Sequence, residues 1–93
     1  PSDFNALFHE AYRAFEVSGA ALLSAIAIHL DLGASYFNEH IDLGNSILRA
    51  IHYPPILHDP KSAIRAEQHE DINLITLLVG ASADGLEILS KEG

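Results

Sequence analysis

The sequence predicts an α+β fold, with helices over residues 1–44 and an antiparallel sheet over residues 45–93. Apolar residues recur at helical spacing from Phe4 to Leu30. Beyond Asn45 the pattern changes to an alternation of apolar and polar residues, which is typical of strands. Ile72–Val79 is almost continuously apolar and rich in branched side chains, as expected of a strand that is covered on both faces.

The helical part is expected to begin with one long amphipathic helix, or with two helices joined near Ser18-Gly19. Ser2 or Asp3 can cap its start, and Gly33 is expected to adopt the left-handed conformation that closes it. A shorter second helix is predicted over roughly Ala34 to Leu43.

Three strands are expected in the second half of the chain. The first covers residues 46–53 and ends at a proline-rich loop over residues 54–63. The second is the apolar run at residues 72–79. Turn chemistry at Asp84-Gly85 predicts a third short strand, over residues 86–89, that pairs back on the second.

Composition indicates one small soluble domain or a piece of a larger one, since 93 residues bury only a modest core. With Pro1 in place of an initiator methionine, both ends are interpreted as cuts. A net charge of −8 argues against nucleic acid and anionic membrane surfaces as partners. We find no apolar run of membrane-spanning length by inspection and no signal peptide. The lack of cysteine fits a cytoplasmic protein and leaves histidine and carboxylate as the available metal ligands.

The pattern His-x-Asp occurs three times, and the local backbone decides which occurrence can bind a metal. On a strand, residues i and i+2 share a face, whereas on a helix they diverge by roughly 200°. His29/Asp31 and His40/Asp42 lie at the ends of predicted helices, so we expect their side chains to diverge. His69/Asp71 alone leads into a predicted strand. Spacing alone favours a strand-edge histidine paired with a neighbouring acid, but the surrounding sequence makes His69/Asp71 the candidate metal pair.

The residues around this pair carry a family resemblance. The stretch Gln68–Leu78, which reads QHEDINLITLL, resembles the iron-binding strand of the isopenicillin N synthase-like family of iron(II)- and 2-oxoglutarate-dependent oxygenases. Most members carry His-Thr-Asp where this chain has His-Glu-Asp. The likeness extends to Leu48–Pro55 before the motif and Asp84–Leu89 after it, and the helical Ala21–Phe37 region also looks like the family.

This resemblance implies a truncated double-stranded β-helix (jelly-roll) barrel, of which residues 45–93 would form the first strands. It also implies that His69 and Asp71 bind Fe(II), with 2-oxoglutarate as cosubstrate, molecular oxygen as oxidant and a small organic molecule as substrate. Family members bind the metal with one more histidine and hold 2-oxoglutarate with an Arg-x-Ser pair. Both lie well downstream in the family, and neither is in this chain.

Tyr53 matches the tyrosine of the family's Tyr-Pro strand, which in several members faces the oxoacid or the substrate. A binding role and simple packing against Ile51 are both open for Tyr53. Arg49 and Arg65 can attract an anionic substrate, but such arginines more often form surface ion pairs.

A three-histidine site that combines His52, His58 and His69 is disfavoured. By strand alternation, His52 points away from the face that carries Tyr53. In the two other His-x-Asp pairs, each histidine is expected to face solvent or to support the C-terminal end of a helix.

Two other functions remain open. One is an isopenicillin N synthase-like oxidase that does not use 2-oxoglutarate, and the other is a catalytically silent fragment or association module. Whatever the function, unpaired sheet edges and a half-covered apolar face are expected to make the chain pair with another copy or with the missing segment.

Overall fold

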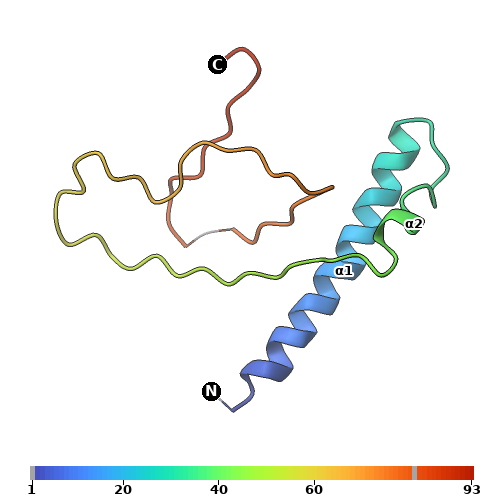
Figure 1. Ribbon diagram of the computed structural model, residues 1–93, viewed down its shortest axis with the longest axis horizontal. Helices are drawn as coiled ribbons and strands as arrows, with labels where there is room; N and C mark the ends of the chain where they lie inside the picture. The colour runs from blue at the N-terminus through green and yellow to red at the C-terminus, as the bar shows by residue number, and fades with distance from the viewer. Residues whose placement is uncertain (1, 81) are drawn as a thin grey trace.

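The computed structural model describes residues 2–80 and 82–93. Helix α1 spans Phe4–His29 and helix α2 spans Asn38–Ile41 (Figure 1). Helix α1 runs without interruption through Ser18-Gly19, so one long helix forms rather than two. Asp3 is its N-cap residue, as expected, although the Asp3 side chain makes no capping hydrogen bond.

Helix α1 ends in a Schellman motif whose left-handed residue is Asp31, with φ of 57°. The Asp31 N–H donates to the carbonyl of Ile28 at 3.1 Å, and the Leu32 N–H donates to the carbonyl of Ala27 at 2.8 Å. Aspartate tolerates this conformation better than most residues. The expectation that Gly33 closes the helix is therefore wrong by two positions.

Helix α2 is much shorter than the predicted second helix. A turn over residues 34–37 precedes it. Asp42 caps its C-terminal end in an extended conformation, and Leu43 follows with φ of 53°. Packing of an apolar face supplies most of a helix's stability. No residue of α2 is buried, so this stabilisation is missing and the helix stops after one turn.

The predicted sheet is absent. Among residues 44–80 and 82–93 the structure contains no strand, so the expectation of a truncated jelly-roll barrel is wrong for this chain. In Figure 1 these residues form a long open loop to one side of α1. The sheet edge that was expected to favour self-association is not formed either.

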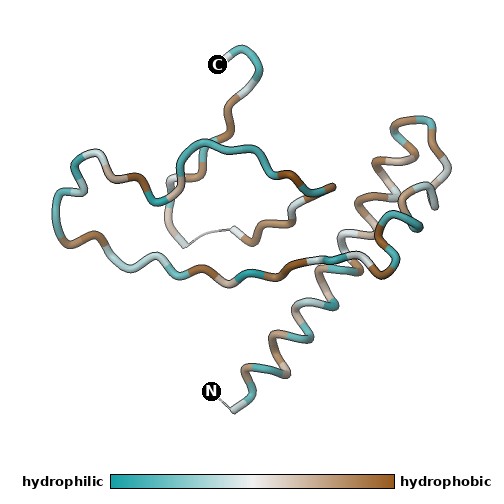
Figure 2. Tube along the Cα trace, in the orientation of Figure 1, coloured by the Kyte–Doolittle hydropathy of each residue, from teal (hydrophilic) through white to brown (hydrophobic). Residues whose placement is uncertain are grey.

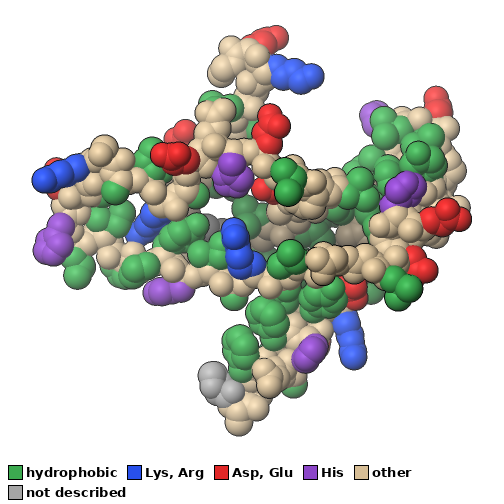
Figure 3. Space-filling view, viewed as in Figure 1, with side chains coloured by type: hydrophobic (Ala, Val, Ile, Leu, Met, Phe, Trp, Pro, Cys, Tyr) green, Lys and Arg blue, Asp and Glu red, His purple; other side chains and the backbone are tan. Residues whose placement is uncertain are grey.

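The cause lies in what a strand requires. A strand is stable only when its N–H and C=O groups pair with a neighbour about 4.8 Å away and its apolar face is covered. Apolar residues recur along the open trace (Figure 2), and many lie uncovered on the face seen in Figure 3. Ile72 is fully exposed, and Leu78 and Val79 are each 70% exposed. Residues 72–79 have the apolar composition of a strand, but most of their apolar side chains are not covered by another layer.

The solvent-exposed area and the radius of gyration are both larger than those of a compact domain. The chain exposes 9086 Å² to solvent, whereas a compact folded protein of this mass exposes roughly 5,300 Å². Its radius of gyration is 17.1 Å, against about 12 Å for a compact domain of this length. The described residues thus bury far less surface than an independent domain.

Burial concentrates on one stripe of α1. Gly19, Leu23 and Ala27 are buried on that helix, at the i, i+4 and i+8 positions of one face. A Cβ placed on Gly19 would lie 3.5 Å from Leu77 Cδ1 and 3.7 Å from Ile75 Cδ1. Ile75 and Leu77 are half-buried where their neighbours are exposed. This contact joins the helical half of the chain to the open half.

Helix α1 is long and apolar enough to cross a membrane, so the expectation that no segment reaches this length is wrong. Core helices of soluble proteins share the same length and composition. Arg13 and Glu16 also carry charge within the helix. The expectation that membranes are not partners stays a prediction.

Replacing Gly19 with alanine tests the stripe. A Cβ at Gly19 meets Leu77 and Ile75 at ordinary van der Waals distances. We therefore expect Gly19→Ala to stabilise α1 by about 0.5–1 kcal/mol through the lower conformational entropy of alanine. Far-ultraviolet circular dichroism during a thermal melt measures this.

Gly80→Ala is the matched control, because Gly80 lies outside any helix and a Cβ there would have no atom within 4 Å. A loss of helicity in Gly19→Ala would show closer packing than the structure has.

Candidate metal centre

His69 and Asp71 lie side by side without a strand to align them. His69 Nε2 is 3.6 Å from Asp71 Oδ1, and the two side chains are 67% and 48% exposed. Two ligands held at about 2.1 Å from one metal ion and at a right angle to each other are ~3.0 Å apart. A small closing movement would therefore let the pair share an ion. Without metal, the same geometry is that of an exposed ion pair when His69 is protonated.

The backbone fixes which nitrogen of His69 faces Asp71. His69 Nδ1 lies 2.7 Å from the carbonyl oxygen of Glu67. A carbonyl oxygen only accepts hydrogen bonds, so Nδ1 carries the proton and donates it. In the neutral ring, Nε2 is then the atom with a free lone pair, which is the state in which histidine binds metals.

Asp71 is held in a similar way from its other side. The Thr76 hydroxyl donates to Asp71 Oδ2 at 2.5 Å, and Asn73 Nδ2 donates to Thr76 Oγ1 at 2.9 Å. Asn73 also donates to the carbonyl of Ile75. One carboxylate oxygen is thus engaged, while Oδ1 remains directed at His69.

Thr76 is a residue that sequence reasoning missed. Strand alternation places position 76 on the opposite face from position 71, so the chain's single threonine received no role. A bend at residues 73–74 breaks that alternation and brings the Thr76 hydroxyl back to Asp71. The one sequence feature that could have pointed to Thr76 is a hydroxyl residue five positions after the candidate ligand Asp71.

The pair borders an open hollow of about 1000 Å³. Its lining combines the residues around the motif with a segment from further along the chain: Ile64, Ala66, Glu67, Gln68, His69, Glu70, Asp71, Gly85, Leu86, Glu87, Ile88 and Leu89. A small organic molecule fits a hollow of this size. Apolar residues of the distal segment therefore line the same hollow as the candidate ligands.

The other two His-x-Asp pairs do not form comparable sites. His29 ends α1, and the left-handed Asp31 turns the chain away from the helix. His40 Nδ1 lies 3.2 Å from the carbonyl of Tyr36, and its ring stacks on the Tyr36 ring. Within residues 2–80 and 82–93, the ion pair between His69 and Asp71 is the one that forms.

The structure places Tyr53 beside Arg65, which sequence reasoning considered separately. The Arg65 guanidinium lies 5.4 Å from the centroid of the Tyr53 ring, and Arg65 Nη2 donates to the carbonyl of Pro54 at 2.7 Å. His52 and His58 are both exposed. Over the described part of the chain, no group of three histidine, cysteine or acidic side chains is placed to hold a metal, so the three-histidine site does not form.

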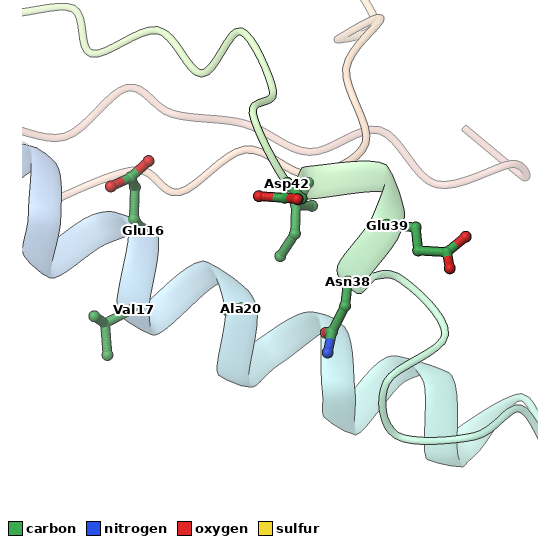
Figure 4. Close-up of a pocket in the computed structure, with 7 residues that line it drawn as sticks. Glu16, Val17, Ala20, Asn38, Glu39 and Asp42 are labelled. Carbon is green, nitrogen blue, oxygen red and sulfur yellow. The ribbon is translucent and has the colours of Figure 1, made fainter.

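A second hollow lies between α1 and α2, with a volume of about 540 Å³. Its acidic residues are Glu16, Glu39 and Asp42. Figure 4 shows Glu39 pointing away from Asp42, so the carboxylates do not converge. This hollow offers no metal site.

Curated relatives identify the family. A 2′-deoxymugineic-acid 2′-dioxygenase from Hordeum vulgare is 37% identical over 78% of this chain and 21% of its own length. A proline hydroxylase from Petromyces alliaceus is 37% identical over 91% of this chain and 27% of its own length. The chain belongs to the 2-oxoglutarate- and iron(II)-dependent oxygenase family. A 2-oxoglutarate-Fe(II) type oxidoreductase from Emericella nidulans agrees, at 32% identity over 94% of this chain.

The match has the length of a segment. The chain spans 21–27% of these three relatives. No family model matches the chain, and no solved structure does. The oxygenase family is therefore supported by sequence likeness to curated proteins, while the fold rests on the structure described above.

Thr76→Val tests whether the hydroxyl supports a metal ligand. Valine keeps the side-chain shape but cannot donate to Asp71. Loss of a partner that orients a ligand typically costs about 10–100-fold in metal affinity, so Thr76→Val should weaken Mn²⁺ binding by that order. Isothermal calorimetry measures it. Thr76→Ser, which keeps the hydroxyl, should retain most of the affinity, and equal losses in both variants would contradict the assigned role.

Proposed function

We propose that this chain is the part of a 2-oxoglutarate- and iron(II)-dependent oxygenase that supplies two of the three protein ligands, His69 and Asp71. One observation carries the proposal. His69 Nε2 and Asp71 Oδ1 face each other at 3.6 Å, while Nδ1 and Oδ2 are each engaged by another group. The two facing atoms are thus the free donor atoms of two side chains already held in place.

The donor set fits Fe(II). Non-haem iron oxygenases bind the metal with two histidines and one carboxylate on one face, and bound iron supplies oxygen activation at the opposite, open positions. In this chain His69 provides a neutral imidazole and Asp71 a negative charge. One histidine is still required, and we assign it to the further length that the curated relatives possess.

Tyr53 is proposed to bind the oxoacid or the substrate through its hydroxyl. The Arg65 guanidinium over its ring supports this role, because it restricts where the Tyr53 side chain can lie.

The proposed substrate is a small organic molecule and the proposed oxidant is molecular oxygen. The names of several relatives specify 2-oxoglutarate, which favours that cosubstrate over an oxidase that does without it.

The surroundings of the site extend the proposal. The uncovered apolar side chains of the open half would be covered by further chain of the same protein in the active oxygenase. A cytoplasmic location is proposed from the absence of cysteine. A net charge of −8 supports the absence of nucleic acid from its partners.

Metal titration of the chain tests the proposed pair. With two protein ligands, binding of Fe(II), or of Mn²⁺ as a substitute that is stable in air, should be weak. His69→Ala and Asp71→Ala should each abolish it, whereas His29→Ala and His40→Ala should leave it intact. Affinity should also fall as the pH is lowered, because a proton on His69 Nε2 competes with the metal.

Calorimetry at several pH values gives both results. Tight binding that persists in His69→Ala and Asp71→Ala would place the metal elsewhere and overturn the proposal. Binding lost equally in His29→Ala would do the same, because His29 lies at the end of α1.

Turnover separates this chain from a complete oxygenase. The 93 residues supplied with Fe(II), oxygen and 2-oxoglutarate should form no detectable succinate, because the third ligand and the Arg-x-Ser pair are missing from the sequence. Chromatography of the reaction mixture measures succinate. Formation of succinate that Asp71→Ala abolishes would show that two protein ligands suffice.

A further inference from the structure

Arg65 makes two contacts with one short segment. Its guanidinium lies 5.4 Å from the centroid of the Tyr53 ring, and its Nη2 donates to the carbonyl oxygen of Pro54 at 2.7 Å. A planar guanidinium can stack on a ring and donate a hydrogen bond from its edge at the same time, which an ammonium group does less well. Arg65 therefore holds both the side chain of one residue and the backbone of the next.

These contacts hold together the two ends of the proline-rich loop, which forms few other hydrogen bonds within the described residues. Pro54, Pro55 and Pro60 lack an N–H group and cannot donate backbone hydrogen bonds. Two hydrogen bonds inside the loop are local: the Lys61 N–H donates to Asp59 Oδ1, and the Ala63 N–H donates to the carbonyl of Pro60. The Arg65 bond spans eleven residues and joins the two ends of the loop.

Within the described part of the chain, Arg65 makes no ion pair. Within residues 2–80 and 82–93, the one contact at ion-pair distance is that of His69 and Asp71, which is an ion pair only when His69 is protonated. The alternative that Arg65 is an ordinary surface ion-pair residue is therefore not what the described residues show. Its interactions are with the Tyr53 ring and a carbonyl oxygen.

The position of Arg65 connects Tyr53 to the metal pair. Its two chain neighbours, Ile64 and Ala66, line the same hollow as His69 and Asp71. We propose that Arg65 is a positioning residue, which fixes Tyr53 relative to the segment that carries His69 and Asp71. The importance of this role for catalysis rests on the proposed function. The contact between Arg65 and Tyr53 is independent of that proposal.

Paramagnetic broadening by Mn²⁺ in nuclear magnetic resonance spectra of the full chain tests this. Mn²⁺ at His69 and Asp71 should broaden the signals of Asn73 and Thr76, which adjoin the pair, and those of the Tyr53 ring. In Arg65→Ala the Tyr53 broadening should fall severalfold while that of Asn73 and Thr76 stays. Arg65→Lys should restore it in part, because it keeps the charge but not the planar group.

Arg49→Ala is the matched control, since it removes an equal charge from the segment before Tyr53. It should leave the Tyr53 broadening unchanged, and a loss equal to that in Arg65→Ala would overturn the proposal by showing a general charge effect. Tyr53 broadening that is unchanged in Arg65→Ala would also overturn it.

A metal-free measurement separates this inference from the proposed function. If Mn²⁺ fails to broaden Asn73 and Thr76, the metal pair is wrong. Nuclear Overhauser contacts between the Arg65 side chain and the Tyr53 ring then decide the positioning role. Their presence in the wild-type chain, with a shift of the Tyr53 ring signals in Arg65→Ala but not in Arg49→Ala, supports it. Their absence overturns it.

Discussion

The contact between one stripe of α1 and the side chains of Ile75 and Leu77 determines where the open half of the chain lies. Gly19 presents no side chain at the point where those two residues approach, and Leu23 and Ala27 continue the same buried face. Since Ile75 and Leu77 are half-buried toward the helix and Thr76 between them is exposed, the Thr76 hydroxyl is available on the other side. That hydroxyl is the group that reaches Asp71. Packing on the helix thus sets the position of a residue that contacts a candidate ligand.

The candidate site itself is organised by short-range polar contacts. His69 binds the carbonyl two residues before it, and Asp71 binds a hydroxyl five residues after it. Both ligands are largely exposed, at 67% and 48%. An exposed ion pair of this kind contributes about 0–1 kcal/mol. The energy that keeps the segment in place must therefore come from apolar packing, and the polar contacts chiefly choose the orientation of the two side chains.

Sequence reasoning succeeded where the information is local. Apolar spacing from Phe4 onward correctly predicts α1. His69 and Asp71 do lie close together, but not for the predicted reason, since no strand forms there, and their binding of a metal stays a prediction. It failed at the sheet, because a strand depends on a neighbour and on a covering layer that the pattern at residues 72–79 does not itself provide. It also missed the Arg65–Tyr53 contact, because only closure of the proline-containing loop brings these two residues together.

Exposure finally constrains what this site can do. Oxygen activation at a metal needs water to be excluded, so that reactive species meet the substrate rather than solvent. Here the hollow beside His69 and Asp71 is open, and the apolar side chains of Leu86 and Ile88, which also line it, are 74% and 90% exposed. Neighbouring apolar residues that are exposed to this extent are typical of an interaction surface or a ligand-binding groove. Solvent therefore reaches both candidate ligands, and the described residues do not by themselves provide the dry site that oxygen activation requires.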